Sequence, residues 1–460
     1  MPFGADVKSL LADAAERATR YVATLDDRPV APDDAALAAL AAFDEPLPKS
    51  PQDPTATLAL LDEAGSPATV ASTGGRYFGF VVGGSFPIAV AANWLATAWD
   101  QNAALPVMSP VATRLHGVVT GWLVDLLGLP VGTGAVFVTG TAMANTAALA
   151  AARDQQLARV GWDVQANGLF GAPELSVVVG ANAHATLVRA LGVLGLGRER
   201  VVRVATDEQG RMRADRLPDA LGGPTVICAQ AGEVNTGAFD PFPDIVQWAR
   251  ERQAWVHVDG AFGLWALADP SRAHLTAGLA DADSWSVDAH KWLNVPYDCG
   301  ICLVRRSEDL RRSFGAAAGY LAPDASFEVM HHTPQASQRA RQIEVWAVLR
   351  TLGRGGVAEL VTRSCSRAEQ MAAKLRSAGL EVLNEIVLNQ VLVRAASDEQ
   401  TVALVDAVQR EGTCWCGPTL WKGRPAMRIS VSGWATSEED IENSAQAIVA
   451  AARTVGEALS

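Results

Sequence analysis

The stretch Ser286-Val-Asp-Ala-His-Lys-Trp-Leu293 places a carboxylate, an imidazole and an amine directly after a short β-rich run. An amine at the end of a strand can form a Schiff base with an aldehyde cofactor. Lysine is rare in this chain, and Lys291 is the single lysine between positions 50 and 373. Taken alone, a lysine at a strand exit is more often a plain surface residue. The interpretation therefore depends on the other segments of the chain.

A second carboxylate follows an apolar strand in Trp255-Val-His-Val-Asp-Gly-Ala-Phe-Gly263. Asp259 in this position can keep a pyridine nitrogen protonated, which makes the ring an electron sink. The same aspartate could instead cap a helix. His184 also follows a strand, where an imidazole could stack on a cofactor ring and move protons. A lone histidine is more often structural, so this residue is informative only together with the others.

A turn of small residues joins a strand to a helix in Val136-Phe-Val-Thr-Gly-Thr-Ala-Met-Ala-Asn145. The backbone N–H groups of Gly140, Thr141 and Ala142, together with the helix dipole, suit a phosphate. No Gly-Lys-Ser/Thr follows, so the turn is not a Walker loop. The other nearby glycines precede the strand, which is the wrong order for a dinucleotide fingerprint.

Seven short apolar runs predict strands that are buried on both faces, at residues 135–138, 175–179, 200–204, 225–229, 254–258, 284–287 and 300–304. Helical patterns such as 142–160 and 185–194 separate several of them. We therefore predict an α/β fold with a mostly parallel seven-stranded sheet and helices on both faces. Ligands in such sheets bind beyond the carboxyl ends of the strands. The phosphate turn, His184, Asp259 and Lys291 are expected to share that edge.

The flanking segments predict two further units. An amphipathic helix over residues 7–25 begins an N-terminal helical arm, residues 1–70, and residues 71–345 form the large domain. A small C-terminal α+β domain is expected over residues 346–460. Helices at 343–352 and 357–378 lead into an α+β unit, whose predicted elements are strands at 381–383, 387–393 and 427–431 and a last helix at 438–452. Thr436 and Glu439 have the spacing of a capping box for the last helix.

The composition excludes several classes of protein. The formal net charge is −12 and no basic stripe is present, so nucleic acid is not an expected partner. The apolar stretches are interrupted by Gly, Ser, Pro and Asn, which argues against a membrane span, and we expect a cytoplasmic protein. Cys299 and Cys302 have a C-x-x-C spacing that could indicate zinc or redox chemistry. Because Cys302 falls on an apolar strand, we expect a buried thiol and no metal site.

The four pieces together supply the groups that a pyridoxal 5′-phosphate (PLP) site requires. Lys291 would carry the cofactor, Asp259 would pair with the ring nitrogen, and His184 would cover the ring. The predicted cofactor-binding residues are Gly140, Thr141, Ala142, His184, Asp259, Ala261, Asp288, His290 and Lys291.

These motifs identify a resemblance. The chain resembles the PLP-dependent group II amino-acid decarboxylases, which include aromatic-L-amino-acid and glutamate decarboxylases. His290-Lys-Trp292 is similar to the family's Schiff-base motif, His257-Val-Asp-Gly-Ala261 to its aspartate segment, and Asn235-Thr-Gly-Ala-Phe-Asp240 to another family run. The resemblance implies PLP fold type I, a homodimer with active sites at the interface, and loss of the α-carboxylate of an L-amino acid, an aromatic one being favoured, as carbon dioxide.

The chain departs from the family pattern at several places. The phosphate turn, which usually carries Gly-Gly-Ser or Ala-Ser followed by Glu, is Thr141-Ala-Met143 here. A Gly-Thr-Thr run is replaced by Gly232-Glu-Val234, which puts a charged residue near the site. Aromatic decarboxylases also carry a loop tyrosine that is thought to protonate Cα from the neighbouring subunit. Val329 stands near that position here, and Tyr320 lies too early. His331 or His332 would then supply the proton, and we take His332 as the third catalytic residue beside Lys291 and His184.

Two alternatives to the amine-forming decarboxylase stay open. Without the loop tyrosine, the carbanion could react with dioxygen, which would make the protein an aldehyde synthase; a lyase or an aminotransferase is also possible on the same fold. The altered phosphate turn and loop also allow a PLP-binding protein with degenerate catalysis. The retained Lys291, Asp259 and His184 argue against that last alternative.

Overall fold

The seven predicted strands are all present in the computed structural model, which describes residues 6–315 and 328–458. The strands are β1 (Gly134–Val138), β2 (Ser176–Gly180), β3 (Val202–Val204), β4 (Thr225–Gln230), β5 (Trp255–Asp259), β6 (Ser284–Asp288) and β7 (Gly300–Val304). They form one sheet in the order β1-β7-β6-β5-β4-β2-β3. Strand β7 is antiparallel to both of its neighbours, and the other pairs are parallel. The prediction of a mostly parallel sheet is confirmed.

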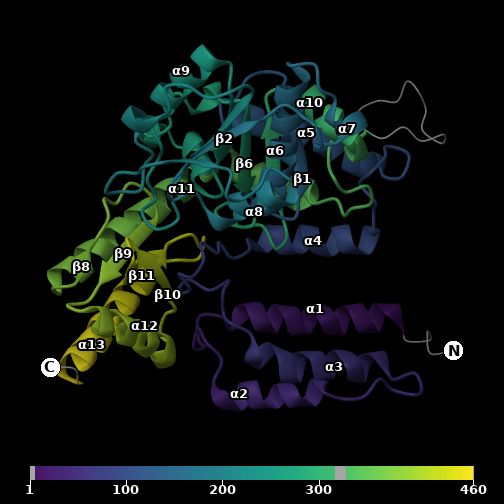
Figure 1. Ribbon diagram of the computed structural model, residues 1–460. Coiled ribbons are helices and arrows are strands. Elements are labelled where there is room, and N and C mark those ends of the chain that lie inside the picture. The colour runs from purple at the N-terminus through teal and green to yellow at the C-terminus, as the bar shows by residue number, and fades with distance from the viewer. Residues whose placement is uncertain (1–5, 316–327, 459–460) are drawn as a thin grey trace.

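Helices cover both faces of this sheet, as expected (Figure 1). Side chains that point to one face, such as Val136 and Val177, pack with α6 (Thr141–Ala158), α8 (Ala185–Val193) and α10 (Ser307–Phe314). Their neighbours along the strands, such as Phe137 and Val178, point to the opposite face. That face is covered by α5 (Pro110–Leu126), α9 (Phe242–Arg252) and the first part of α11 (Gln342–Ser377). Burial on both faces explains why the strands read as continuous apolar runs.

A second, four-stranded antiparallel sheet forms a smaller core. Its strands are β8 (Glu381–Val382), β9 (Gln390–Arg394), β10 (Gly417–Trp421) and β11 (Arg424–Ser430), packed with α12 (Asp398–Glu411) and α13 (Glu438–Ala458). Strand β10 was not predicted. It is an edge strand with Pro418 and the exposed Leu420, so it lacks an apolar pattern. The hairpin turn at Lys422–Gly423 places both residues at positive φ, which joins β10 to β11.

The predicted capping box is displaced by one residue. Ser437, and not Thr436, accepts a hydrogen bond from the backbone N–H of Asp440 at 3.0 Å, and Asp440 accepts from the backbone N–H of Ser437 at 2.9 Å. The Thr436 hydroxyl donates instead to the Gly75 carbonyl at 2.8 Å. Glu439 therefore has no part in this cap.

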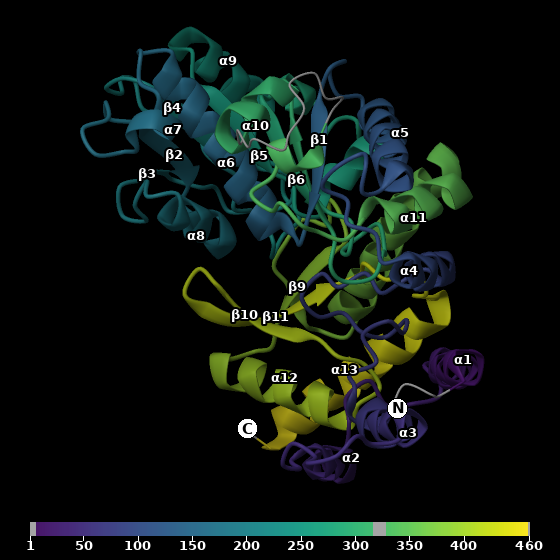
Figure 2. The ribbon, with the colours of Figure 1, turned by 90° about the vertical axis from the view of Figure 1, so that its right-hand side faces the viewer.

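The remaining helices precede the large sheet in the sequence. They are α1 (Val7–Ala23), α2 (Asp34–Ala39), α3 (Pro54–Gly65) and α4 (Pro87–Trp99), and the short α7 (Val164–Asn167) follows α6. Figures 1 and 2 show α1, α2 and α3 gathered beyond α4, away from the seven-stranded sheet. Helix α1 has no buried residue, so its apolar face is not covered by the rest of the described chain. Within the described residues, no helix is long and apolar enough to cross a membrane.

Candidate active site at the carboxyl edge of the sheet

The turns that follow β1, β2, β5 and β6 meet at one edge of the sheet, because all four strands run in the same direction. They enclose a cavity of about 250 Å³. All nine predicted cofactor-binding residues line this cavity: Gly140, Thr141, Ala142, His184, Asp259, Ala261, Asp288, His290 and Lys291. The structure thus brings together groups that are separated by up to 151 positions in the sequence, from Gly140 to Lys291.

The Lys291 amine is held by Asp288, which ends β6. Its Nζ lies 3.1 Å from Asp288 Oδ2. The other carboxylate oxygen, Oδ1, accepts the backbone N–H of Thr141 at 2.6 Å. One of the N–H groups that the sequence assigned to a phosphate is therefore used by Asp288. The aspartate fixes the lysine relative to the start of α6.

His290 is neutral and fixed beside that pair. Burial lowers the pKa of the His290 imidazole, and its Nδ1 accepts the backbone N–H of Cys299 at 3.1 Å. The opposite nitrogen, Nε2, lies 3.6 Å from Asp288 Oδ2. Tyr297 stacks on the imidazole with ring centroids 4.3 Å apart. His290 thus forms part of the cavity wall beside the Asp288 carboxylate.

Asp259 ends β5 and is buried on the cavity wall. Its Oδ2 accepts a hydrogen bond from Asn145 Nδ2 at 3.1 Å, and its Oδ1 one from the backbone N–H of Ala261 at 3.3 Å. The structure therefore does not support the alternative role of Asp259 as a helix cap. A carboxylate held between two neutral donors keeps its negative charge available for a cation in the cavity.

His184 caps a helix and also lines the cavity. It is the N-cap of α8, and its Nδ1 accepts the backbone N–H of Thr186 at 3.3 Å and contacts the Thr186 hydroxyl at 2.7 Å. Burial lowers the pKa of His184, and the positive charges of Lys291 and Arg428 add to that effect. The negative charges of Asp259 and Asp288 oppose this shift, and the net effect favours the neutral ring.

The turn at the start of α6 has an unused donor. The Thr141 hydroxyl is buried and makes no hydrogen bond with any residue that the structure describes, which is unfavourable unless a ligand completes the site. Space is tight beneath it, since a Cβ on Gly300 would lie 2.4 Å from Gly140 Cα. An amine, a carboxylate and an orphan hydroxyl at a helix N-terminus together fit the aldehyde, ring nitrogen and phosphate of PLP.

The loop residues are less directly connected to the cavity. His332 does not line the cavity of its own chain; its Nδ1 lies 2.9 Å from the carbonyl oxygen of Glu328, and burial lowers its pKa. Its neighbour His331 pairs with Glu328 at 3.0 Å. Val329 is buried, and Tyr320 lies outside the described residues. The catalytic role assigned to His332 stays a prediction.

Glu233 lies near the cavity, as the sequence indicated, but it is not among the residues that line it. Its carboxylate accepts the backbone N–H groups of Asn235 at 2.7 Å and Thr236 at 2.9 Å. Burial raises its pKa. The glutamate therefore stabilises the turn before Gly237, and its neighbours Gly232 and Val234 line the cavity instead.

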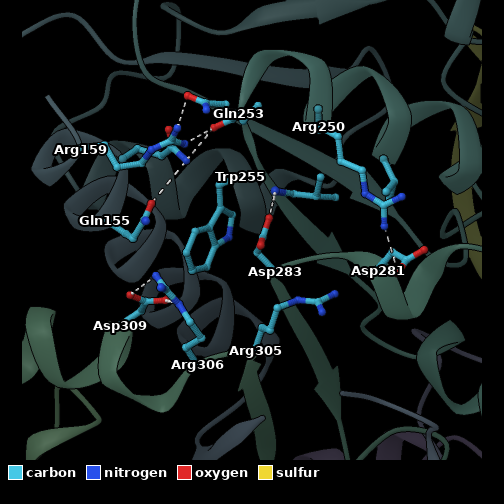
Figure 3. Close-up of a pocket in the computed structure, with 15 residues that line it drawn as sticks. Gln155, Arg159, Arg250, Gln253, Trp255, Asp281, Asp283, Arg305, Arg306 and Asp309 are labelled. Carbon is cyan, nitrogen blue, oxygen red and sulfur yellow. Dashed lines mark hydrogen bonds and ion pairs between the residues drawn. The ribbon is translucent and has the colours of Figure 1, made fainter. Parts of the chain in front are cut away.

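A larger cavity of about 420 Å³ lies at the opposite edge of the sheet (Figure 3). Its charged side chains neutralise one another: Arg250 pairs with Asp281 at 3.2 Å and Arg306 with Asp309 at 3.0 Å. It has no lysine in its lining. It therefore lacks the amine that a Schiff base requires, which the smaller cavity has in Lys291.

Sequence reasoning missed several residues of the site. Asn145 lies one helical turn after Thr141, which turns its side chain toward the sheet, and this spacing could have identified it. Gln230 and Phe262 also line the cavity. Arg428 comes from β11 of the small sheet, and no local pattern in the sequence connects it with the cavity.

Comparison with known proteins agrees with this geometry. A model of the pyridoxal-dependent decarboxylase conserved domain matches residues 66–395. Aromatic-L-amino-acid decarboxylase of Bacillus atrophaeus is 27% identical over 391 residues, covering 80% of this chain and 79% of that protein. Human acidic amino acid decarboxylase GADL1 is 27% identical over 324 residues, covering 67% of this chain and 61% of that protein.

Among solved structures, Oryza sativa TDC with PLP and tryptamine superimposes with a TM-score of 0.91 at 24% identity, and the match covers 99% of both chains. This likeness confirms PLP fold type I. The family match spans more than half of the chain, including every residue of the carboxyl-edge cavity. The chain therefore belongs to the pyridoxal-dependent decarboxylases, carboxy-lyases of amino acids whose cofactor is pyridoxal 5′-phosphate.

Proposed function

We propose that the protein removes the α-carboxylate of an aromatic L-amino acid and releases the amine and carbon dioxide. The observation that carries this proposal is the Lys291 amine, held 3.1 Å from Asp288 in the same cavity as Asp259. The likeness to the aromatic-L-amino-acid decarboxylase of Bacillus atrophaeus favours an aromatic substrate. The equally similar acidic amino acid decarboxylase makes an acidic substrate the alternative to test.

The proposed roles follow from the surroundings of each group. Lys291 would bind the cofactor, with Gly140, Thr141 and Ala142 at its phosphate. Asp259 would hold a proton on the ring nitrogen, and the neutral His184 would cover the ring. Bound PLP supplies an electron sink for the pair of electrons that the departing carboxylate leaves behind.

Arg428 is the group that would orient the substrate carboxylate. It is partly buried, and burial lowers the pKa of its guanidinium. Its charge reaches His184, whose pKa it helps to lower. Because a partly desolvated cation gains most from an anionic partner, a substrate carboxylate beside Arg428 would bind and be directed toward the cavity.

The proton that Cα receives would come from His332, acting from a second subunit. We include a homodimer in the proposal because apolar side chains remain exposed on α1 and α4, among them Leu11 at 61% and Leu95 at 55%. An apolar helix face of this kind is normally covered by another surface. A cytoplasmic location also belongs to the proposal, and the six free cysteines are in keeping with a reducing compartment.

A second outcome is favoured by one observation. Val329, which is buried and apolar, stands where aromatic decarboxylases carry a proton-donating tyrosine. Without a proton at Cα, the carbanion would react with dioxygen and water, giving an aldehyde, ammonia and hydrogen peroxide in addition to carbon dioxide.

Product analysis decides between these outcomes. The PLP-loaded protein is offered aromatic and acidic L-amino acids in air, and amine, aldehyde and peroxide are assayed together. Amine without peroxide supports the decarboxylase. Aldehyde with stoichiometric peroxide would establish the synthase, and turnover of acidic amino acids alone would overturn the aromatic assignment.

A further inference from the structure

A continuous chain of hydrogen bonds runs behind Asp259, on the face of the sheet that α6 covers. Trp255 Nε1 donates to Ser284 Oγ at 2.8 Å, and Ser284 Oγ lies 2.9 Å from His257 Nδ1. His257 Nε2 lies 2.9 Å from Asn145 Oδ1, and Asn145 Nδ2 donates to Asp259 Oδ2 at 3.1 Å. All five side chains are buried. The chain connects the first residue of β5 to its last.

The Asp259 end of this chain, together with a neutral imidazole at His257, fixes the direction of every hydrogen bond in it. The indole nitrogen of Trp255 can only donate, and an ionised carboxylate at Asp259 can only accept. Asn145 must therefore turn its amide nitrogen to Asp259 and its oxygen to His257. His257 must in turn carry its proton on Nε2 and accept at Nδ1 from the Ser284 hydroxyl. The Ser286 hydroxyl also donates to Asn145 Oδ1, which opposes an inverted amide.

The imidazole in the middle of this chain cannot easily change its charge. His257 is fully buried, and burial lowers its pKa to about 3. It is therefore neutral near pH 7, in the tautomer that its neighbours impose. Its two nitrogens are both occupied, so no proton reaches Asp259 from behind without breaking the chain.

The far end of the chain reaches the second cavity (Figure 3), where Trp255 lies among Gln155, Asp283 and Arg306. The Asp259 end reaches the cavity that holds Lys291. The chain of hydrogen bonds thus spans the length of β5, about 13 Å at the rise of a strand. Along it, each polar side chain donates a hydrogen bond to the next one toward Asp259. A sheet interior needs no polar groups for stability alone, so their arrangement calls for a functional explanation.

We propose that Asn145 and His257 are positioning residues for the decarboxylation, holding the Asp259 carboxylate ionised and aligned with the ring nitrogen of the cofactor. This inference rests on the proposed role of Asp259. Asn145 supplies a neutral donor that orients the carboxylate without cancelling its charge. His257, set by Ser284 and Trp255, prevents that amide from rotating. Neither residue touches the reacting atoms.

The variant Asn145→Asp tests this arrangement because it is isosteric but cannot donate to Asp259 unless it is protonated. At pH 8 two carboxylates would face each other, and we expect kcat to fall about 10- to 100-fold and the dissociation constant of PLP to rise. At pH 6 a shared proton restores the donor, so kcat should recover at least several-fold relative to wild type. The titratable groups in contact with residue 145 are Asp259 and His257; His184, Asp288 and Lys291 line the cavity beyond them.

The exposed Asn167→Asp makes the same charge change away from the chain and should leave both quantities as in wild type. A loss in Asn145→Asp that does not vary with pH would show a merely structural role and overturn the proposal. The variant Asp259→Asn tests the proposed role of Asp259 separately from the proposed positioning role of Asn145. If that variant keeps wild-type kcat and PLP affinity, the role of Asp259 itself is wrong. If it loses both while Asn145→Asp resembles wild type, the positioning role alone is wrong.

A measurement on the unaltered protein needs a variant only to assign one signal. The chain has seven histidines, and ¹⁵N chemical shifts of labelled imidazoles report which ring nitrogen carries the proton. We expect His257, assigned by its absence in His257→Gln, to be neutral with Nε2 protonated from pH 6 to pH 8. A charged ring, or a proton on Nδ1, would contradict the directed chain.

Discussion

The side-chain nitrogen of Lys291 lies 3.1 Å from Oδ2 of Asp288, three residues earlier on the same turn after β6. This pair explains how the amine can be kept in place before the cofactor arrives. Asp288 is itself fixed by the backbone N–H of Thr141 at 2.6 Å, so the lysine is tied to the helix that would receive the phosphate. The amine and the phosphate turn are therefore positioned by one carboxylate.

Lys291→Ala should abolish covalent retention of PLP and lower kcat about 1,000-fold or more, because the covalent link to the enzyme is lost. Borohydride reduction followed by peptide mass spectrometry measures the link directly. Wild type should show the cofactor mass on the peptide that contains Lys291. Lys374→Ala, which removes a half-buried lysine paired with Glu442 outside the cavity, should behave as wild type. Cofactor mass on a different lysine would refute the assignment.

Thr141→Val should weaken PLP binding, because it removes a buried hydroxyl that has no partner among the residues described. Loss of one hydrogen bond to a charged group corresponds to about 1.5–3 kcal/mol, or roughly 10- to 150-fold in affinity. Fluorescence titration of the apoprotein with PLP gives the dissociation constant. Thr146→Val is the matched control on the same helix, since its hydroxyl donates to the Ala142 carbonyl at 2.8 Å. Equal effects of both variants would mean that Thr141 acts only through helix stability.

His332→Gln should shift the products from amine toward aldehyde and peroxide, because it removes the imidazole proposed to protonate Cα. Total consumption of substrate should change less than the ratio of products. Since burial lowers the pKa of His332, its charged form grows as the pH falls, and the amine fraction in wild type should grow with it. His274→Gln, at an exposed histidine, serves as the control. An unchanged product ratio in His332→Gln would remove this residue from the mechanism.

The large sheet and most of the site could be predicted from the sequence, because several strands end in, or are followed within a few residues by, a residue with a distinct chemistry. Strands buried on both faces produce unbroken apolar runs, and Asp259 and Lys291 directly follow two of these runs. The two residues lie at the same edge of the sheet because the strands before them run in the same direction. Strand β7 is antiparallel to both β1 and β6. Strands β1 and β6 therefore still run in the same direction, and their carboxyl ends lie at the same edge.

What the sequence did not predict depends on contacts between distant elements. Arg428 comes from β11 in the small sheet, and only tertiary packing brings its charge near His184. The sequence placed the charge of Glu233 near the site, but it did not show that four donors of Asn235 and Thr236 bind the carboxylate. Strand β10 was missed because an edge strand that has Pro418 and an exposed Leu420 shows no alternating pattern.

Stability should fall steeply below pH 6.5, because buried histidines must gain protons on unfolding. Burial lowers the pKa of His116 to about 4, whereas the unfolded chain has the usual value of about 6.5. Between these values the unfolded state binds one more proton, so the free energy of unfolding decreases as the pH falls, by about 1.4 kcal/mol per pH unit. Asp240, whose pKa burial raises to about 6, acts in the opposite sense between about pH 4 and 6.

The contribution of His116 is isolated by comparing wild type with His116→Gln, because Asp240 is present in both proteins. Urea unfolding of the apoproteins at one protein concentration, from pH 7 to pH 5, gives the two dependences. The variant should be less stable at pH 7, where the imidazole packs edge-on against Phe137 with centroids 5.4 Å apart. The free energy of unfolding of the variant should nevertheless decline more gently below pH 6.5. The difference between the two slopes should be about 1.4 kcal/mol per pH unit. Parallel curves would show that His116 is protonated equally in the folded and unfolded states, and that its burial does not govern acid sensitivity.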